Sequence, residues 1–170
     1  MSHLLPVRGH TPILGDDCRV MPTAVLTGDV VAGRGCTFWF HSAVRGDVNA
    51  VRLGDRVNVQ DGAVLHCTYQ RAALTVGSGV SIGHRAVVHG CTVHDDVLIG
   101  MGAIVMDHAV VESGCLIAAG AVVTQGKTCE SGWIYAGVPA KPVKRLSHEA
   151  FAGEVQRIAE AYGMYASWYE

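Results

Sequence analysis

Branched apolar residues recur at every sixth position over most of the chain. Where the pattern is clearest, seven of eight consecutive steps are six residues long and one is five. A period of six fits neither a helix nor a simple alternating strand. It predicts an all-β solenoid, a parallel β-helix in which short strands stack into coils around a continuous core. The alternative, a β-sandwich with chance spacing, does not account for so long an in-phase series, whose members are Leu53, Val59, Leu65, Val76, Ile82, Val88, Val93, Ile99, Val105, Val111, Ile117 and Val123.

The period breaks twice and ends near Leu146. Cys67–Thr75 is out of phase and predicts a loop inserted at a corner, and Val44–Arg52 is a second irregularity. Such breaks usually mark loops on the functional face of a solenoid. We expect a β-helix domain over residues 1–146, with the loop insertion at 67–75, and a C-terminal α-helix over 147–170 packed against it. The helix is indicated by apolar positions on one face, at Phe151, Val155, Ile158, Ala159 and Tyr162.

Composition and charge narrow the classes of function. Hydrophobic residues make up 49% of the 170 residues and charged residues 16%, which favours one packed domain over disorder. A net charge of -2 argues against nucleic acid and against a polybasic membrane anchor as partners. No apolar stretch is long enough to span a membrane, and no signal sequence is visible. The six cysteines show no zinc-ribbon spacing, so we expect reduced thiols and a cytoplasmic location.

Three of the nine histidines lie close to the loop insertion. His66 and His89 each follow an inward-pointing position, and His84 lies two residues after Ile82. Three neutral imidazoles held by a rigid coil suit Zn²⁺, with Fe²⁺ or Co²⁺ also possible. The competing interpretation for each is a solvated surface histidine. His94 shares the position of His66 and His89 in the repeat but lies beyond the insertion, so spacing alone does not separate it from them.

The chain contains a series of short motifs, which are Arg45-Gly46-Asp47, Asn58-Val59-Gln60-Asp61-Gly62, Leu65-His66, Ile82-Gly83-His84, Val88-His89-Gly90-Cys91 and Ile99-Gly100-Met101-Gly102-Ala103. Together these motifs resemble the gamma-class carbonic anhydrase family. The resemblance covers roughly residues 12–146 and the closing helix. It implies a left-handed parallel β-helix of hexapeptide repeats that forms a homotrimer with a metal ion at each subunit interface. It also implies that His66 and His89 come from one chain and His84 from its neighbour.

The same resemblance implies roles for five further residues. Gln60 matches the residue that orients the metal-bound hydroxide. Arg45 matches an arginine that pairs with carboxylates across the interface and holds bicarbonate, with Asp47 and Asp61 as its partners. Tyr162 matches a tyrosine that reaches the active site from the C-terminal helix. The alternative for Arg45 and Asp61 is a purely structural ion pair. The alternative for Tyr162 is a core aromatic residue on the apolar face of the helix.

One departure from the family concerns proton transfer. The archetypal enzyme carries a glutamate directly after its R-x-D element, where this chain has Val48, and others in an acidic loop, whereas the 67–75 insertion contains no acidic residue. We therefore expect a lyase of the carbonate dehydratase kind, hydrating CO₂ reversibly to bicarbonate, with proton export limiting its rate.

Three alternatives stay open. The first is an acyl-CoA thioesterase or acyltransferase, since a thioesterase could use the same metal and hydroxide. The second is a catalytically weak metal-binding scaffold trimer. The third is a ferric-siderophore binder, which no exposed cationic cluster supports.

Overall fold

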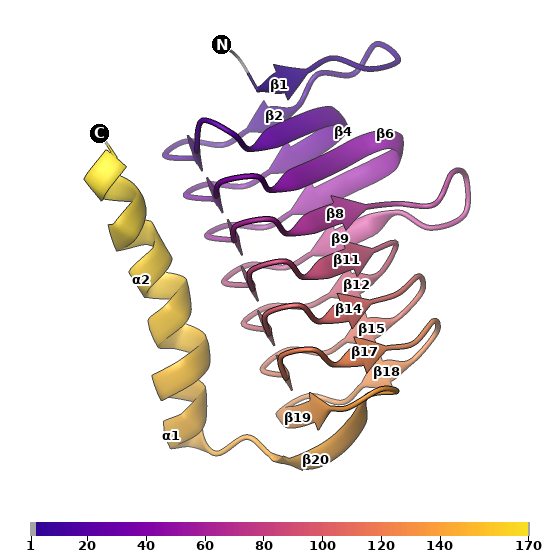
Figure 1. The fold of residues 1–170 in the computed structure, drawn as a ribbon, viewed down its shortest axis with the longest axis vertical. Helices are drawn as coiled ribbons and strands as arrows, with labels where there is room; N and C mark the ends of the chain where they lie inside the picture. Colours follow the sequence, from indigo (N-terminus) through magenta and orange to yellow (C-terminus); the bar gives the residue numbers. More distant parts are fainter. Residues whose placement is uncertain (1–2, 170) are drawn as a thin grey trace.

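The computed structural model describes residues 3–169 and shows a parallel β-helix with one long helical segment running alongside it (Figure 1). The predicted solenoid is confirmed. Each coil contributes one short strand to each of three faces, and strands on a face pair in parallel with those of the coils above and below. A last strand, β20 (Lys141–Arg145), pairs antiparallel with β19 and leads into the helix.

The strands fall into three stacked sets. The first face holds β1 (Leu4–Leu5), the start of β4 (Val25–Ala32), the start of β6 (Ala43–Leu53), β8 (Val64–His66), β11 (Val87–His89), β14 (Ile104–Val105) and β17 (Val122–Val123). The second holds β2 (Ile13–Leu14), the ends of β4 and β6, β9 (Leu74–Val76), β12 (Thr92–Val93), β15 (Val110–Val111) and β18 (Thr128–Cys129). The third holds β3 (Arg19–Val20), β5 (Thr37–Phe38), β7 (Asn58–Val59), β10 (Ser81–Ile82), β13 (Leu98–Ile99), β16 (Leu116–Ile117) and β19 (Trp133–Ala136).

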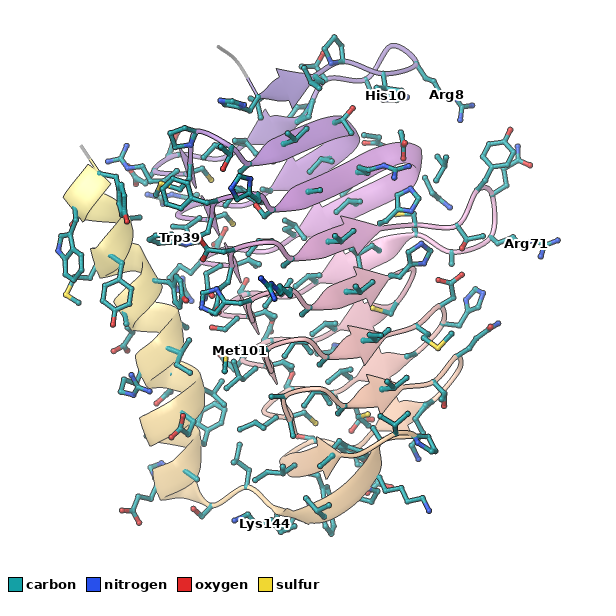
Figure 2. All side chains as sticks on the ribbon, viewed as in Figure 1. Arg8, His10, Trp39, Arg71, Met101 and Lys144 are labelled. Atoms are coloured by element: carbon teal, nitrogen blue, oxygen red, sulfur yellow. The ribbon has the colours of Figure 1, made fainter. Side chains whose placement is uncertain are left out.

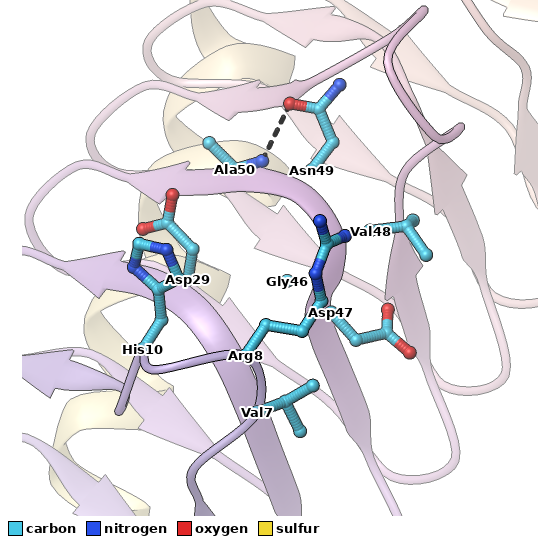
Figure 3. Close-up of a pocket in the computed structure, with 9 residues that line it drawn as sticks. All are labelled: Val7, Arg8, His10, Asp29, Gly46, Asp47, Val48, Asn49 and Ala50. Atoms are coloured by element: carbon cyan, nitrogen blue, oxygen red, sulfur yellow. Dashed lines mark hydrogen bonds between the residues drawn. The ribbon is translucent and has the colours of Figure 1, made fainter.

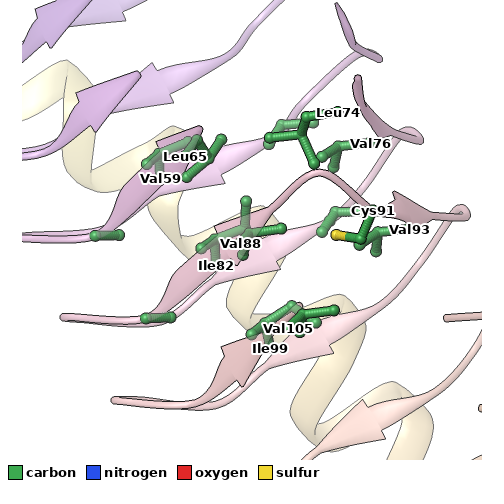
Figure 4. Packing of buried hydrophobic residues seen from close by; sticks show 14 of the residues in the cluster. Val59, Leu65, Leu74, Val76, Ile82, Val88, Cys91, Val93, Ile99 and Val105 are labelled. Carbon is green, nitrogen blue, oxygen red and sulfur yellow. The ribbon is translucent and has the colours of Figure 1, made fainter. Parts of the chain in front are cut away.

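The six-residue period produces the core. Val88 pairs in register with Leu65 in the coil before it and with Val105 in the coil after it, and all three are fully buried (Figure 4). Each fully buried branched side chain stabilises the fold by roughly 1.5–3 kcal/mol. In β4 the inward positions include Val30 and Ala32, and Ala32, six residues after Leu26, pairs in register with Leu53. The pairing of β4 with β6 shifts register between Gly28 and Val30, because β6 holds more residues than β4 at this point.

The first face carries an apolar column on its outer side. Its members pair in register from coil to coil, half-buried except for Ile104, which is 37% exposed. On the outer side of the second face the matching positions are mixed, with Arg52, Thr75, Thr92 and Thr128 beside the apolar Ile13, Val31 and Val110. A solvated β-face is ordinarily polar, so the first face differs from the second in its chemistry. The column consists of Val25, Ala43, Val64, Val87, Ile104 and Val122.

The C-terminal segment packs against the third face. It comprises α1 (His148–Ala150), a π-helical stretch (Phe151–Gln156), α2 (Arg157–Ala166) and a 3₁₀ turn (Ser167–Tyr169). Ser147 caps its start by accepting a hydrogen bond from the Ala150 amide, which typically stabilises a helix by about 1 kcal/mol. Helix α2 contacts β5 and β7, and Tyr162 packs edge-on against Trp39 with ring centroids 5.2 Å apart. Over residues 3–169, none of the helices combines the length and apolar character needed to cross a bilayer.

Candidate metal centre

His66 and His89 lie side by side at the ends of β8 and β11. The two strands pair in parallel with these residues as register partners. The Nδ1 atom of His66 is 3.1 Å from the Nε2 atom of His89. Two nitrogen ligands of a tetrahedral zinc ion, each at about 2.0–2.1 Å from the metal, are themselves roughly 3.3 Å apart. The distance between the two imidazoles therefore fits a shared metal ion.

The outer nitrogens of both rings are held by carboxylates. Nε2 of His66 lies 3.0 Å from Oδ1 of Asp47, and Nδ1 of His89 lies 2.5 Å from Oδ1 of Asp107. An ionised carboxylate only accepts hydrogen bonds, so these two nitrogens carry the protons. The nitrogens that face each other then present bare lone pairs, an arrangement that is unfavourable by itself and is relieved by a cation between them. The donor set thus suits a metal ion, with the outer carboxylates fixing both rings.

The charge state of this cluster follows from its partners. Burial opposes ionisation of Asp47, but hydrogen bonds from Arg45 and His66 outweigh it and lower the pKa of Asp47. The pKa of Asp107 is lowered in the same way by Thr68 and His89. Burial also lowers the pKa of His66, which favours the neutral imidazole that a metal requires.

His84 occupies the opposite edge of the first face. It precedes β11, whereas His89 ends it, so the length of the strand separates them. Nδ1 of His84 lies 3.0 Å from Oδ2 of Asp61, and Nε2 lies 3.1 Å from the hydroxyl of Tyr162. Burial and, less strongly, Asp61 raise the pKa of Tyr162 to about 12, so its phenol stays protonated. His84 is therefore a third oriented imidazole, with Asp61 holding its outer nitrogen.

Gln60 belongs to the His84 edge. It is 4% exposed, and its amide donates to Oδ1 of Asn58, whose own amide donates to the hydroxyl of Ser81. This chain of hydrogen bonds fixes the side chain. Gln60 lines an apolar cavity of about 530 Å³ between α2 and the third face, together with His84 and Tyr162.

The candidate residues thus form two clusters instead of one. We call Arg45, Asp47, His66 and His89 the first half-site, and Gln60, Asp61, His84 and Tyr162 the second half-site. Within residues 3–169, no three side chains able to bind a metal lie close enough to hold one ion. A single copy of the chain does not assemble the three histidines.

The sequence analysis did not identify two residues of this site. Asp107 and Thr68 extend the first half-site, with the Thr68 hydroxyl donating to Oδ2 of Asp107 at 2.5 Å. The available signal was the spacing of 18 residues between His89 and Asp107, which is the length of one coil. Only the register between coils turns that spacing into a contact.

A second, smaller cavity lies beside the first half-site. It has a volume of about 240 Å³ and is lined partly by Asp47 and Val48 (Figure 3). Arg8 and His10, from the N-terminal hairpin, and Asp29 line it as well. Asp47 is thus the member of the first half-site that also lines this cavity.

Comparison with known proteins identifies the family. A model for bacterial transferase hexapeptide repeats (six repeats) matches residues 90–125. "Gamma carbonic anhydrase 2, mitochondrial" of Arabidopsis thaliana is 38% identical over 151 residues, covering 86% of this chain and 54% of that protein. A carbonic anhydrase of Geobacillus kaustophilus is 34% identical over 167 residues, covering 98% of this chain and 91% of that protein. The chain belongs to the gamma-class carbonic anhydrase family.

The gamma-class assignment agrees with the fold. A hexapeptide transferase family protein from Anaplasma phagocytophilum superposes with a TM-score of 0.91 at 34% identity, covering 98% of both chains. This gamma-class chain spans a little over half the length of the Arabidopsis relative. The family implies a metal ion in general, and the donor set of the two half-sites fits one.

Proposed function

We propose that the protein is a metal-dependent carbonic anhydrase that interconverts CO₂ and bicarbonate at the interfaces of a homotrimer. The observation that carries the proposal is the placement of the half-sites. They occupy the two edges of one face, each with its histidines already oriented by carboxylates. Joining the first half-site of one copy to the second half-site of another gives three imidazoles around one position. Zn²⁺ suits this set, and Fe²⁺ or Co²⁺ is an alternative.

The apolar column supports a ring of three copies. A contact that joins two different surfaces is head-to-tail, and such contacts close into a ring when the rotation between copies permits. In a β-helix of triangular section, the two half-sites lie at the corners that bound the first face. Three copies turned with this face inward bring unlike corners together and bury the column from Val25 to Val122. Removing this apolar surface from water favours association.

In the proposed site each side chain has a separate role. Bound zinc would supply a water whose pKa is lowered to about 7, and thus a nucleophile at neutral pH. Gln60, fixed through Asn58, would orient a nucleophile held at this site toward the carbon of CO₂. Arg45, whose side chain is 47% exposed, offers its guanidinium to the product bicarbonate. Asp47 and Asp61 hold imidazoles within a chain, and Asp61 also meets Arg45 across the interface.

Few side chains of the proposed site are available to accept the proton that the reaction releases. Asp47 accepts hydrogen bonds from both Arg45 and His66, and the loop insertion offers no carboxylate. Tyr162, with its raised pKa, is a poor acceptor at neutral pH. The proton therefore leaves mainly to dissolved buffer, and this transfer limits turnover. The chain works in the cytoplasm under this proposal, consistent with six unpaired cysteines.

One observation favours a second candidate, an acyl-CoA thioesterase. The cavity of about 530 Å³ that contains His84 is walled by Leu98, Leu116 and Ile158, and its size and lining suit an acyl chain. A thioester carbonyl at the His84 end would meet the same nucleophile. Hydrolysis of acyl-CoA measured beside CO₂ hydration separates the two candidates.

The decisive experiment reconstitutes metal-free protein separately with Zn²⁺, Fe²⁺ and Co²⁺. We expect one metal ion per chain and CO₂ hydration with at least one of the three. His89→Ala should abolish stoichiometric binding, whereas His94→Ala, which changes an exposed histidine in the adjoining repeat, should preserve it. Equal loss of metal in both variants would contradict the assigned ligands. Stoichiometric binding without hydration would favour the thioesterase or a scaffold trimer.

A further inference from the structure

Two hydrogen bonds link the loop insertion to His89, a proposed metal ligand, through the side chains of Thr68 and Asp107. Thr68, the second residue after β8, donates its hydroxyl to Oδ2 of Asp107 at 2.5 Å. The other oxygen of the same carboxylate, Oδ1, lies 2.5 Å from Nδ1 of His89. Each carboxylate oxygen therefore has its own partner. The loop insertion, the coil that contains His89 and the next coil, which contains Asp107, therefore meet at the Asp107 carboxylate.

The backbone around Thr68 is held in place. Thr68 and Ala72 exchange two backbone hydrogen bonds that close the base of the loop, at 3.0 and 3.2 Å. The Asn49 amide donates to the Thr68 carbonyl oxygen, and the guanidinium of Arg8 lies 5.6 Å from the centre of the Tyr69 ring. The far end of the loop, with Arg71, projects away from the β-helix (Figure 2). The base of the loop is thus anchored by backbone hydrogen bonds and by Asn49, and Arg8 contacts Tyr69 beyond it.

The absence of a side chain at Gly90 leaves space for the Asp107 carboxylate. Gly90, directly after His89, has a φ of +52°, and a Cβ atom there would meet Oδ1 of Asp107 and the side chain of Ala72. Any other residue at position 90 would displace either the carboxylate or the base of the loop. The glycine is therefore explained by the contact between Asp107 and His89, in addition to its backbone conformation.

We propose that the loop insertion orients a metal ligand: Thr68 fixes Asp107, and Asp107 fixes the ring and tautomer of His89. This rests on the proposed metal site. Thr68 and Asp107 are positioning residues, since they act through His89. Held this way, the imidazole keeps its proton on Nδ1 and presents Nε2 toward His66. An insertion that supplies proton-transfer carboxylates in the archetype would here serve the geometry of the ligand.

The first test needs no metal. In metal-free protein labelled with ¹⁵N-histidine, His89 should be protonated at Nδ1. Thr68→Val removes only the hydroxyl and should give a mixture of tautomers, while Thr68→Ser should retain the wild-type signal. Thr75→Val, the same change at an exposed position of β9, is the matched control and should have no effect. A wild-type tautomer in Thr68→Val would overturn the proposal.

The second test measures zinc affinity by competition with a chelator. Outer partners of metal-bound histidine typically contribute 10–100-fold to affinity, so we expect about a 10-fold loss in Thr68→Val and a larger loss in Asp107→Ala. Because Thr68 acts through Asp107, the double variant should bind no more weakly than Asp107→Ala alone. Independent, additive losses would refute the ordered relay. Absence of zinc binding in the wild type, with the expected tautomers, would reject the proposed function and leave the orientation of His89 established.

Discussion

Mixing two inactive variants should restore metal binding if the site is shared between chains. His84→Ala lacks a ligand of the second half-site, and His66→Ala lacks one of the first. Each interface of a cyclic trimer takes one half-site from each of two neighbours. Neither variant alone forms a complete interface, so each homotrimer should bind zinc poorly.

The expected recovery follows from counting interfaces. After the variants are unfolded together in equal amounts and refolded, each position in the ring is filled at random. An interface is complete only when the His84→Ala chain supplies the first half-site and the His66→Ala chain supplies the second. The probability is one half for each, so about a quarter of the wild-type zinc content should return. Elemental analysis after removal of free metal measures it, and native mass spectrometry confirms that mixed trimers formed.

A matched control uses two variants of the same half-site. In a mixture of His66→Ala and His89→Ala, neither chain carries both first half-site ligands, so no interface is complete. This mixture should recover no zinc although its trimers are equally mixed. Recovery in the control, or none in well-folded mixed trimers of the first pair, would refute the shared site.

Four further predictions concern stability, thiol chemistry and turnover. Gly100→Ala places a Cβ 2.5 Å from the backbone nitrogen of Ala119 in the next coil, and should destabilise the fold by about 1–3 kcal/mol in chemical denaturation. Gly163→Ala, whose Cβ meets open space within α2, should stabilise it by about 0.5–1 kcal/mol. Cys18 is half-buried whereas the other five cysteines are buried, and the neighbouring Cys36 lowers the pKa of Cys18, so Cys18 should alkylate first at neutral pH; equal labelling of the other cysteines by peptide mass spectrometry would contradict this. CO₂ hydration should rise with buffer concentration, and a buffer-independent rate would show that a protein group exports the proton.

The sequence by itself determined the architecture of the coils. A side chain repeating every six residues must return to the same place on each face, so the series through Val88 and Val105 specifies both the strands and their buried side. It also located the histidines near the break in the repeat. These features are local, because the orientation of a residue depends on its neighbours within one strand.

Contacts between coils were decided only by the tertiary structure. His66 and His89 are 23 residues apart, whereas His89 and Asp107 are 18 apart, because the loop lengthens one coil without changing the pairing of its strands. The period locates the extra residues at 67–75 and within Val44–Arg52, but it does not reveal which side chains the pairing of coils then brings into contact. The separation of His84 from His89 arises within one coil: β11 lies between them, and its fixed length keeps the third histidine out of reach of the other two within one chain.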